Sequence, residues 1–493
     1  MPTGSSLRDF AALARRHGGA LVARELTLDS DTPVSAFLKL RQGAAGGDGF
    51  LLESLEGGER AGRYAYLGVR PRHRLEIRGE VARLYVGATR RRPLVESRGP
   101  LAAVRALLRG RSPGVPEGLP PFTGGLVGFF GFGVARWFEP GLPDRHPEET
   151  GFPDAELFAV DTVVALDRVR PRAILLTSAW PAEAGGVARA FAAAQRTLDG
   201  LERRLAGPAP RAAALRPPPP GPIQVAPSRA AFRAVVRRGR EHVHAGDCMQ
   251  VVLSRRFSAP FEGDPFELYR ALRAVNPSPY CFHLALGPRA LVGASPELLV
   301  QVERDTLVLR PIAGTRARGR SPAEDRAQER ELLADPPERA EHLMLVDLAR
   351  NDIGRVARPG SVAVESLLEV ERYSHVMHLV SQLRGRLRSG LGPLDALAAC
   401  FPAGTVSGAP KFRAMQLIDE LETQRRGPYA GAVGWISHGG EATLALTLRS
   451  FFLEGGVARW QAGAGIGADS DPELETLETE HKAGALRQAL GRA

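Results

Sequence analysis

The ten residues Thr306-Leu307-Val308-Leu309-Arg310-Pro311-Ile312-Ala313-Gly314-Thr315 combine a strand pattern with a turn signal. The apolar run predicts a buried strand over 306–312, and the Gly-Thr pair predicts a tight turn after it. Such a turn frees two backbone N–H groups and the Thr315 hydroxyl to face an anion. Gly-Thr pairs are also common in ordinary turns, so the stretch gains meaning only from the motifs around it.

The composition is that of a globular protein with an ample core: 493 residues, of which 44% are hydrophobic and 24% charged. This length suits two to four ordinary domains. The sequence has no run of about 18 uncharged apolar residues that would predict a membrane span, and its N-terminus lacks a signal-peptide pattern. The cysteines Cys248, Cys281 and Cys400 fit no metal spacing, and so sparse a set suits a reduced compartment. We therefore expect a cytoplasmic protein.

The chain is basic, with a net charge of +10, so nucleic-acid binding has to be considered. The arginines, however, are scattered and often stand beside acids, and the densest run, at 90–92, has no interleaved aromatic residue. A basic nucleic-acid-binding protein stays a distant alternative. Lysine is scarce: Lys39, Lys411 and Lys482 are the only three. A lysine that persists among so many arginines is a candidate for a role that needs a compact ammonium group.

The distribution of strands, helices and prolines divides the chain into three parts. Residues 1–206 mix short strands with helices, residues 207–226 form a proline-rich linker, and residues 227–493 form a second domain. In that domain strands are expected at 250–257, 281–287, 290–293, 298–303, 306–312, 430–437, 442–454 and 457–462. Helices are expected at 229–245, 266–275, 325–334, 338–350, 374–387, 393–400, 410–423 and 472–490. Many strands and long helices without strict alternation favour an α+β fold.

Two predicted helices each carry a pair of acids three residues apart, Glu338 with Glu341 and Glu475 with Glu478. This spacing puts each pair on one helix face. Two carboxylates from separate helices, completed by water and a substrate oxygen, suit Mg²⁺, and Lys482 follows one turn after Glu478. The spacing alone equally allows two solvated acidic faces with ordinary ion pairs.

A glycine-rich run, Gly463-Ala464-Gly465-Ile466-Gly467, follows a predicted strand and precedes the last predicted helix. It mimics a dinucleotide-binding motif, but too few residues follow it to supply the second strand of a βαβ unit. We therefore expect a glycine-rich loop whose N–H groups hold a carboxylate near the start of a helix.

Several ordered segments make the chain resemble the chorismate-utilising enzymes over nearly its whole length. These segments are 246–254, 293–297, 311–315, 341–352, 372–378, 401–411 and 463–465, with 51–54 and 124–128 in the N-terminal part. The resemblance implies a large mixed two-sheet β-sandwich core with surrounding helices. It is strongest to the branch of the family that makes anthranilate from chorismate.

The resemblance also implies roles for individual residues. The Mg²⁺ ligands correspond to Glu341 and Glu478, supported by Glu338 and Glu475. The residues that contact chorismate correspond to Gly314, Thr315, Tyr429, Arg449, Gly463, Ala464, Gly465 and Lys482. The catalytic residues correspond to Glu297, His378, Gln250 and Thr405. In this scheme Glu297 protonates the departing ring hydroxyl and therefore needs a raised pKa. A structural histidine on a helix is the alternative for His378.

Two positions indicate which nucleophile attacks the ring. Relatives that add water have Lys as a base where this chain has Gln250, and relatives that make aminodeoxychorismate have Lys in place of Ala313. Loss of a general base costs water a factor of about 10²–10⁴, whereas ammonia already has a free lone pair. The expected reaction is amination of chorismate at ring carbon 2 with elimination of pyruvate, the first committed step of tryptophan biosynthesis. Aminodeoxychorismate formation, or another conversion of chorismate, is the nearest alternative.

The expected source of ammonia is a partner protein. None of the cysteines lies in the Gly-flanked elbow that a glutaminase nucleophile needs, so the resemblance implies a separate glutaminase subunit and a hetero-oligomer. It also implies a feedback site for tryptophan at Ser54, Pro279, Tyr280 and Cys281, where a rigid aromatic turn would seat the indole. Relatives often have Met at the position of Cys281, which leaves the pocket size open. Simple packing of a strand against a turn is the alternative.

Overall fold

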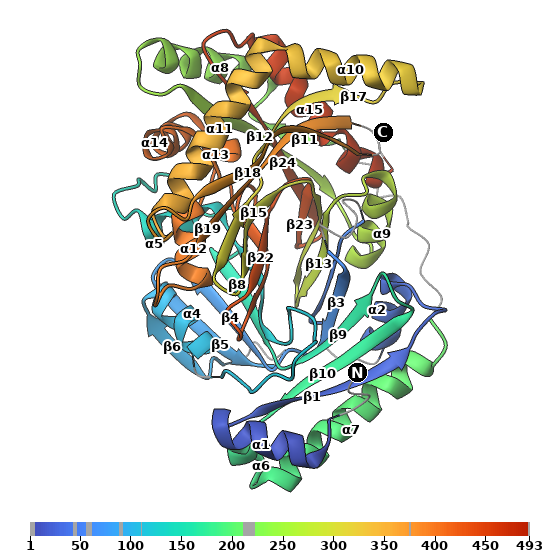
Figure 1. Cartoon of the computed structure of the whole chain (residues 1–493). Coiled ribbons are helices and arrows are strands. Elements are labelled where there is room, and N and C mark those ends of the chain that lie inside the picture. Colours follow the sequence, from blue (N-terminus) through green and yellow to red (C-terminus); the bar gives the residue numbers. More distant parts are fainter. Residues whose placement is uncertain are drawn as a thin grey trace.

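Two large β-sheets form the centre of the molecule, and helices cover their outer faces and one end (Figure 1). The computed structural model describes residues 5–42, 47–55, 62–87, 92–109, 111–210, 222–373 and 376–491. Each sheet contains twelve described strands, which pair antiparallel. The α+β fold with a two-sheet core, predicted from the sequence, is confirmed.

The strands follow one another across the sheets in an order that differs strongly from their order in the chain. The first sheet runs β1 (Ala20–Thr27), β10 (Arg172–Ala179), β9 (Thr162–Asp167), β3 (Tyr64–Val69), β2 (Gly49–Glu53), β13 (Tyr280–Leu286), β14 (Arg289–Ser295), β23 (Ser450–Glu454), β24 (Val457–Ile466), β12 (Gln250–Pro260) and β11 (Gln224–Ala226), with β20 (Gly408–Ala409) beside β12. The second sheet runs β17 (Ile312–Ala317), β19 (Val376–Arg386), β16 (Thr306–Leu309), β15 (Leu298–Glu303), β22 (Ala442–Leu446), β21 (Ala432–Ser437), β7 (Gly125–Phe130), β8 (Ala155–Val160), β4 (His73–Arg78), β5 (Val81–Val86) and β6 (Val95–Arg98), with β18 (Ala363–Arg372) beside β19.

The helices gather in an N-terminal group and a C-terminal group. The N-terminal helices are α1 (Leu7–His17), α2 (Pro33–Arg41), α4 (Pro100–Arg109), η1 (Phe132–Val134), α5 (Ala135–Phe138), α6 (Pro181–Ala184) and α7 (Val187–Ala206). The C-terminal helices are α8 (Arg229–His244), α9 (Pro265–Val275), α10 (Pro322–Ala334), α11 (Pro336–Gly354), α12 (Pro393–Cys400), α13 (Gly404–Ser407), α14 (Lys411–Leu421) and α15 (Pro472–Ala489). None of the helices in the described part of the chain is both long enough and apolar enough to cross a bilayer.

The main hydrophobic core lies between the two sheets. It includes Phe129 and Leu157 from the second sheet and Leu284 and Leu291 from the first, all almost completely buried. A second core lies on the outer face of the first sheet, where α1, α2, α7, α9 and α15 pack. Burial of apolar surface, at about 25 cal/mol per Å², is the main term that holds such layers together.

Both sheets draw strands from both sides of the predicted linker. In the first sheet β2 pairs with β13, and in the second β7 pairs with β21. Gly128 and Gly434 face each other across the second junction, where a Cβ would lie only 2.0 Å and 2.1 Å from neighbouring carbonyl oxygens. Division of the chain into 1–206, 207–226 and 227–493 stays a prediction. Residues 211–221 of that linker lie outside the described residues.

The predicted helix over 374–387 is wrong, because Val376–Arg386 is strand β19. Met377, Leu379, Ser381 and Leu383 are buried at alternate positions, which is the period of a strand. The apolar residues also fit a helical spacing, but pairing with β16 and β17 on one edge and β18 on the other decides the conformation.

Three smaller predictions also need correction. The predicted strand 442–454 is two strands, because the chain leaves the second sheet after β22 and enters the first at β23, with Arg449 at a φ of 47° between them. The run 463–465 lies in β24 opposite β12 and not in a loop. Gly314, with a φ of 75°, forms a β-bulge within β17 and not a turn after a strand. In the last two cases pairing with a distant strand overrides the local signal of a glycine.

Candidate active site

The predicted catalytic residues lie at the end of the molecule where β12, β17, β19 and β24 meet α11, α13 and α15 (Figure 1). The two long helices begin on aspartate caps. The Asp335 carboxylate accepts from the N–H of Glu338 at the start of α11, and Asp471 accepts from Glu473 and Leu474 at the start of α15. These caps fix the first turn of each helix and with it the faces that carry the predicted metal ligands.

Glu297 lies in the short crossing between β14 and β15, where only 7% of the residue is exposed. The Thr405 hydroxyl donates to its Oε1 over 2.8 Å. Burial raises the pKa of Glu297 to about 8, although the Thr405 hydrogen bond and the cations Lys482 and Arg449 act in the opposite direction. Glu297 therefore holds its proton at neutral pH, which is the state a general acid needs.

Arg449 occupies the crossing between the two sheets and faces three other members of the site. Burial lowers the pKa of its guanidinium, and the nearby Tyr429, Glu478 and Glu297 partly restore it. The Tyr429 hydroxyl lies next to Gly463, where an added Cβ would be 2.8 Å from the Tyr429 oxygen. Only glycine at 463 leaves room for that hydroxyl. Burial raises the pKa of Tyr429 to about 12, so it is a hydrogen-bond donor at neutral pH.

The acidic face of α15 is directed at the same strand. Lys482 donates to the carbonyl oxygen of Gly463 over 3.1 Å and pairs with Glu478 over 2.7 Å. Burial alone would raise the pKa of Glu478, but Lys482, Glu475 and Arg449 together outweigh it and keep that pKa low. Burial, together with the neighbouring Glu478, raises the pKa of Glu475. Of the two acids, Glu478 is therefore the carboxylate available to a cation.

The acidic face of α11 is joined to the site through Gln250, the first residue of β12. The Gln250 amide donates to Glu341 Oε1 over 2.9 Å. The same amide lies over Gly465, where a Cβ would be 2.5 Å from Gln250 Nε2. Glu338 does not join this contact, because Arg316 binds it over 3.0 Å. Gln250 thus joins Glu341 to Gly465 of β24. Lys482 and Tyr429 contact Gly463, two residues earlier in the same strand.

The bulge in β17 positions the predicted histidine. His378 stands opposite Thr315 in the β17–β19 pairing, and its Nδ1 lies 3.0 Å from Thr315 Oγ1 and 3.1 Å from the carbonyl oxygen of Gly314. Burial lowers the pKa of His378, and the cations Arg449 and Lys482 act in the same direction. A lowered pKa favours the neutral ring. His378 lies on strand β19, so the helix in the alternative of a structural histidine is wrong, while its catalytic role stays a prediction.

The structure therefore brings nearly all of the predicted residues to one place. Ala464 is the exception among the side chains, because it points into a separate apolar cluster with Phe232 and Val236 of α8. Only its backbone is available to a ligand. The sequence reasoning missed the ion pair of Arg426 and Glu422 behind the site, where Arg426 donates to the carbonyl oxygen of Val406 over 2.7 Å. The two residues have the i,i+4 spacing of an ion pair, and this spacing could have signalled them.

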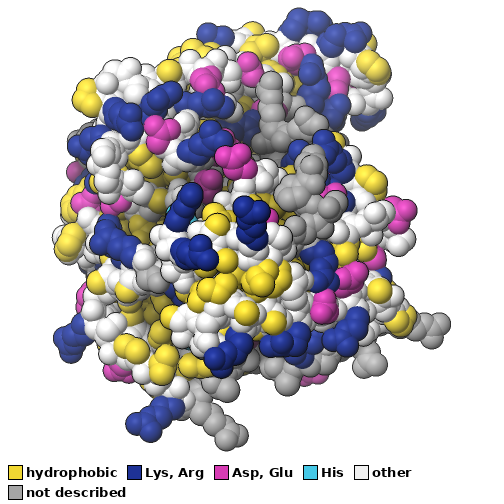
Figure 2. All heavy atoms as spheres, turned by 60° about the horizontal axis from the view of Figure 1, so that its bottom comes forward, with side chains coloured by type: hydrophobic (Ala, Val, Ile, Leu, Met, Phe, Trp, Pro, Cys, Tyr) yellow, Lys and Arg dark blue, Asp and Glu magenta, His cyan; other side chains and the backbone are white. Residues whose placement is uncertain are grey.

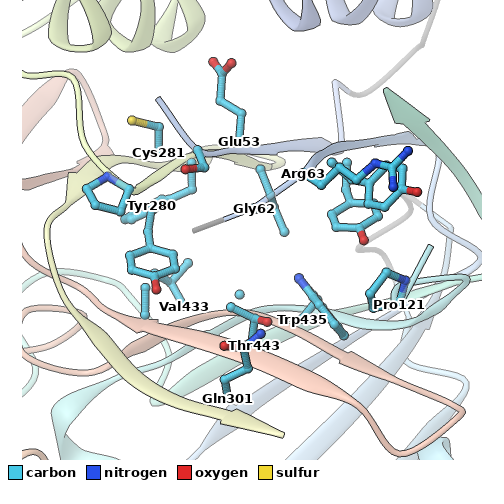
Figure 3. Close-up of a pocket in the computed structure, with 18 of the residues that line it drawn as sticks. Glu53, Gly62, Arg63, Pro121, Tyr280, Cys281, Gln301, Val433, Trp435 and Thr443 are labelled. Carbon is cyan, nitrogen blue, oxygen red and sulfur yellow. The ribbon is translucent and has the colours of Figure 1, made fainter. Parts of the chain in front are cut away.

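The four residues predicted for tryptophan also come together, at a cavity of about 260 Å³ between the two sheets, called here the inter-sheet cavity (Figure 3). Its wall in the first sheet includes Ser54, Pro279, Tyr280 and Cys281. Its wall in the second sheet includes Gln301, Val433, Trp435, Thr443 and Ala445. These second-sheet residues were not predicted, because their place depends on how the sheets stack.

The side chains of Glu53 and Cys281 point away from the inter-sheet cavity (Figure 3). They are cross-strand partners in β2 and β13, and both face α9. Arg273 of α9 donates to Glu53 over 2.7 Å, and Cys281 is buried in the apolar core beneath that helix. The replacement of Met by Cys281 therefore changes the packing under α9 more directly than the space inside the cavity.

Basic side chains do not form a continuous stripe on the face that Figure 2 shows. Lys and Arg side chains stand in separate groups between acidic, apolar and uncharged ones (Figure 2). Many arginines are held by carboxylates, such as Arg172 by Glu25 and Asp167. This arrangement gives no support to the nucleic-acid alternative, which needs a basic surface free to contact phosphates.

Comparison with known proteins shows the family of the chain. Residues 50–488 match the family of chorismate binding enzymes. The chain is 46% identical over 496 residues to anthranilate synthase component 1 of Streptomyces coelicolor, covering 98% of this chain and 91% of that protein. It is 45% identical to anthranilate synthase component 1 of Thermus thermophilus, covering 94% and 96%.

Solved structures give the same result. Anthranilate synthase component I from Streptococcus pneumoniae matches with a TM-score of 0.76 and 37% identity, covering 86% of this chain and 92% of that one. The menaquinone-specific isochorismate synthase from Escherichia coli matches with a TM-score of 0.73 but only 20% identity, so it shares the fold alone. The chain therefore belongs to the chorismate-binding enzymes. Within that family it groups with the first components of anthranilate synthase.

Proposed function

We propose that the chain is the large subunit of an anthranilate synthase, which converts chorismate and ammonia to anthranilate, pyruvate and water. The protonated carboxyl of Glu297 carries this proposal, because it lies buried beside two cations, Arg449 and Lys482. The cations suit the carboxylates of a dianionic substrate. Glu297 then donates its proton to the departing 4-hydroxyl, which leaves as water.

The groups around Gln250 support ammonia as the nucleophile. Its amide contacts Glu341 and lies over Gly465, at the edge of the strand that Lys482 and Tyr429 also contact. An amide orients ammonia by hydrogen bonds but cannot take a proton from water. Neither position 250 nor position 313 holds a lysine that would serve as a base. Elimination of pyruvate then makes the ring aromatic.

We further propose Mg²⁺ as the cofactor, held by Glu341 and Glu478. The donor set fits this ion, because carboxylate oxygens from two helices leave further positions for water and a substrate oxygen. Glu341 accepts a hydrogen bond from Gln250, which lies over Gly465 of β24, and Glu478 pairs with Lys482, which donates to Gly463 of the same strand. When bound, Mg²⁺ would hold a ring carboxylate and stabilise negative charge there. Glu338 and Glu475, three residues before the two ligands, would support them without binding the ion directly.

One assay tests the function. Purified protein with Mg²⁺, chorismate and an ammonium salt is expected to release pyruvate and a blue-fluorescent aromatic amine in equal amounts. Chromatography of the product distinguishes anthranilate from aminodeoxychorismate, the nearest alternative. With glutamine as the nitrogen source, the same assay is expected to need an added glutaminase subunit, because the chain has no nucleophilic cysteine elbow. Salicylate or isochorismate as the main product would refute the proposal.

The partner and the location follow from the same proposal. The relatives are first components by name, which supports a second component and a hetero-oligomer in which that component supplies ammonia. Cys248, Cys281 and Cys400 are all buried, and no disulfide joins them in the described part of the chain, which supports the reducing cytoplasm as the location.

We propose that the inter-sheet cavity binds tryptophan as a feedback inhibitor. Its apolar and aromatic lining suits an indole ring, and Ser54 and Gln301 supply polar groups. The cavity includes β13 and β15, which continue to the active site through β14 and Glu297. A ligand that separates or clamps the sheets there would act on the position of Glu297.

Filling this cavity is expected to relieve inhibition. In Thr443→Trp a bulky side chain enters the cavity from β22, so tryptophan should inhibit at least about 10-fold more weakly, which corresponds to roughly 1.4 kcal/mol of lost binding. Cys281→Ala is the matched control, since its side chain points away from the cavity (Figure 3), and it should keep wild-type inhibition. Titration of anthranilate formation with tryptophan measures both. Full sensitivity in Thr443→Trp would place the inhibitor elsewhere.

A further inference from the structure

Lys411 is a rare lysine that the proposed reaction does not use. It begins α14, and its ammonium donates to both carboxylate oxygens of Asp352 over 2.7 Å and to the carbonyl oxygen of Cys400 over 3.4 Å. Only 14% of the Lys411 side chain and 12% of the Asp352 side chain are exposed. The three groups come from α14, α11 and the end of α12, so Lys411 joins three helices at one point.

These contacts close a loop that carries a catalytic group. The chain from Cys400 to Lys411 contains Thr405, whose hydroxyl donates to Glu297. The loop packs tightly on α11, because a Cβ on Gly404 would lie 2.8 Å from Leu348 Cδ1. Lys411 therefore fastens both ends of the loop to each other and to α11. None of the described hydrogen bonds joins the Thr405 side chain to α11, because its hydroxyl donates to Glu297.

A small cavity of about 30 Å³ lies beside the contact between the loop and the acid. Glu297, Thr405, Asp352 and Cys400 all line it, together with Arg310 and a group of leucines. The charged or titratable groups that face Glu297 are Lys482 on α15, Arg449 between β22 and β23, Arg310 after β16, Asp352 on α11 and the Cys400 thiol on α12. Arg310 is held by Glu371 and Asp352 by Lys411.

We propose that Lys411 is a positioning residue that, by bridging Asp352 and the Cys400 carbonyl, holds the Thr405 hydroxyl on the carboxyl of Glu297. The inference rests on the proposed role of Glu297 as the general acid. The Thr405 hydrogen bond favours the carboxylate form of Glu297. When the loop is released, this bond is lost, and Glu297 keeps its proton to higher pH.

The test compares Lys411→Met with Lys39→Met. Lys39 is a matched control, because it makes the same pair of contacts away from the site, to Asp31 over 2.8 Å and to the carbonyl oxygen of Leu205 over 2.9 Å, with 11% of its side chain exposed. In Lys411→Met, kcat should fall about 10-fold or more, and the loss of activity at high pH should move up by about one pH unit. Lys39→Met should keep the wild-type kcat and pH profile.

A double substitution separates positioning from mere loss of structure. Thr405→Val should shift the pH profile by itself, and adding Lys411→Met should shift it no further, because both act through one hydrogen bond. Asp352→Asn, which keeps the shape of the side chain, gives the same direction of shift if Lys411→Met does not fold. An unchanged profile in a folded Lys411 or Asp352 variant, or additive shifts in the double variant, would overturn the inference. If Glu297→Gln keeps the wild-type profile, the proposed role of Glu297 fails instead.

Discussion

Glu297→Gln is expected to lower kcat by about 10²–10⁴-fold, the usual contribution of a general acid. Glutamine has nearly the same shape and still accepts from Thr405, but it has no proton to give to the departing hydroxyl. The remaining activity should also lose a pH dependence that the wild type shows. Because the pKa of Glu297 is raised to about 8, the wild-type rate, measured at a constant concentration of free ammonia, should be level below this pH and fall above it as the carboxyl ionises.

Anthranilate fluorescence followed from about pH 6 to about pH 10 measures both effects, since this range spans the pKa of a strongly raised carboxyl. Glu365→Gln is a suitable control, because this acid lies on the exposed strand β18 and should leave rate and profile unchanged. A Glu297→Gln variant with near wild-type kcat, or with the same fall above pH 8, would show that another group supplies the proton.

Glu478→Gln is expected to weaken Mg²⁺ binding strongly and nearly abolish turnover. The amide keeps the hydrogen-bonding shape but removes the negative charge that a hard cation needs. A loss of about 10²-fold or more in metal affinity is expected, since even residues behind metal ligands contribute about 10–100-fold. Calorimetric titration with Mg²⁺ measures binding without reference to activity, and the dependence of the rate on Mg²⁺ measures its effect on catalysis.

Glu473→Gln provides the control on the same helix, because Glu473 pairs with Arg233 at the surface of α15. It should bind Mg²⁺ like the wild type. Glu341→Gln should resemble Glu478→Gln if the two carboxylates share one ion. Wild-type affinity in either ligand variant would remove that residue from the metal site, whereas a wild-type rate with lost affinity would separate the metal from the reaction.

The residues predicted for the site from the sequence come together in the structure, whereas some of the elements that carry them were predicted wrongly. The prediction that the two pairs of acids three residues apart lie on helices is correct. Helices α11 and α15 both begin on an aspartate cap that the sequence shows. Strand β19 was predicted as a helix, because its apolar residues fit both periods and only pairing on both edges decides. Gly314 and Gly463 were placed in a turn and a loop, since a glycine in a paired strand gives the same local signal.

Contacts between distant residues account for what remained hidden. Nothing near Lys411 in the sequence points to Asp352, because the contact depends on how α14 lies against α11. Likewise, the side of β13 that Cys281 faces follows from its pairing with Glu53, and the sequence alone gives no register. A shift of one helical turn or of one strand residue would change both contacts. Sequence patterns do not place helices and strands that accurately.

The sharing of both sheets between the two ends of the chain has a consequence for biosynthesis. Strands β2 and β7 leave the ribosome long before their partners β13 and β21 are made. Until then each has an open edge that can pair with another nascent chain, which is a known route to misassembly. Neither half can therefore mature first, and recombination between genes cannot exchange the halves as independent modules.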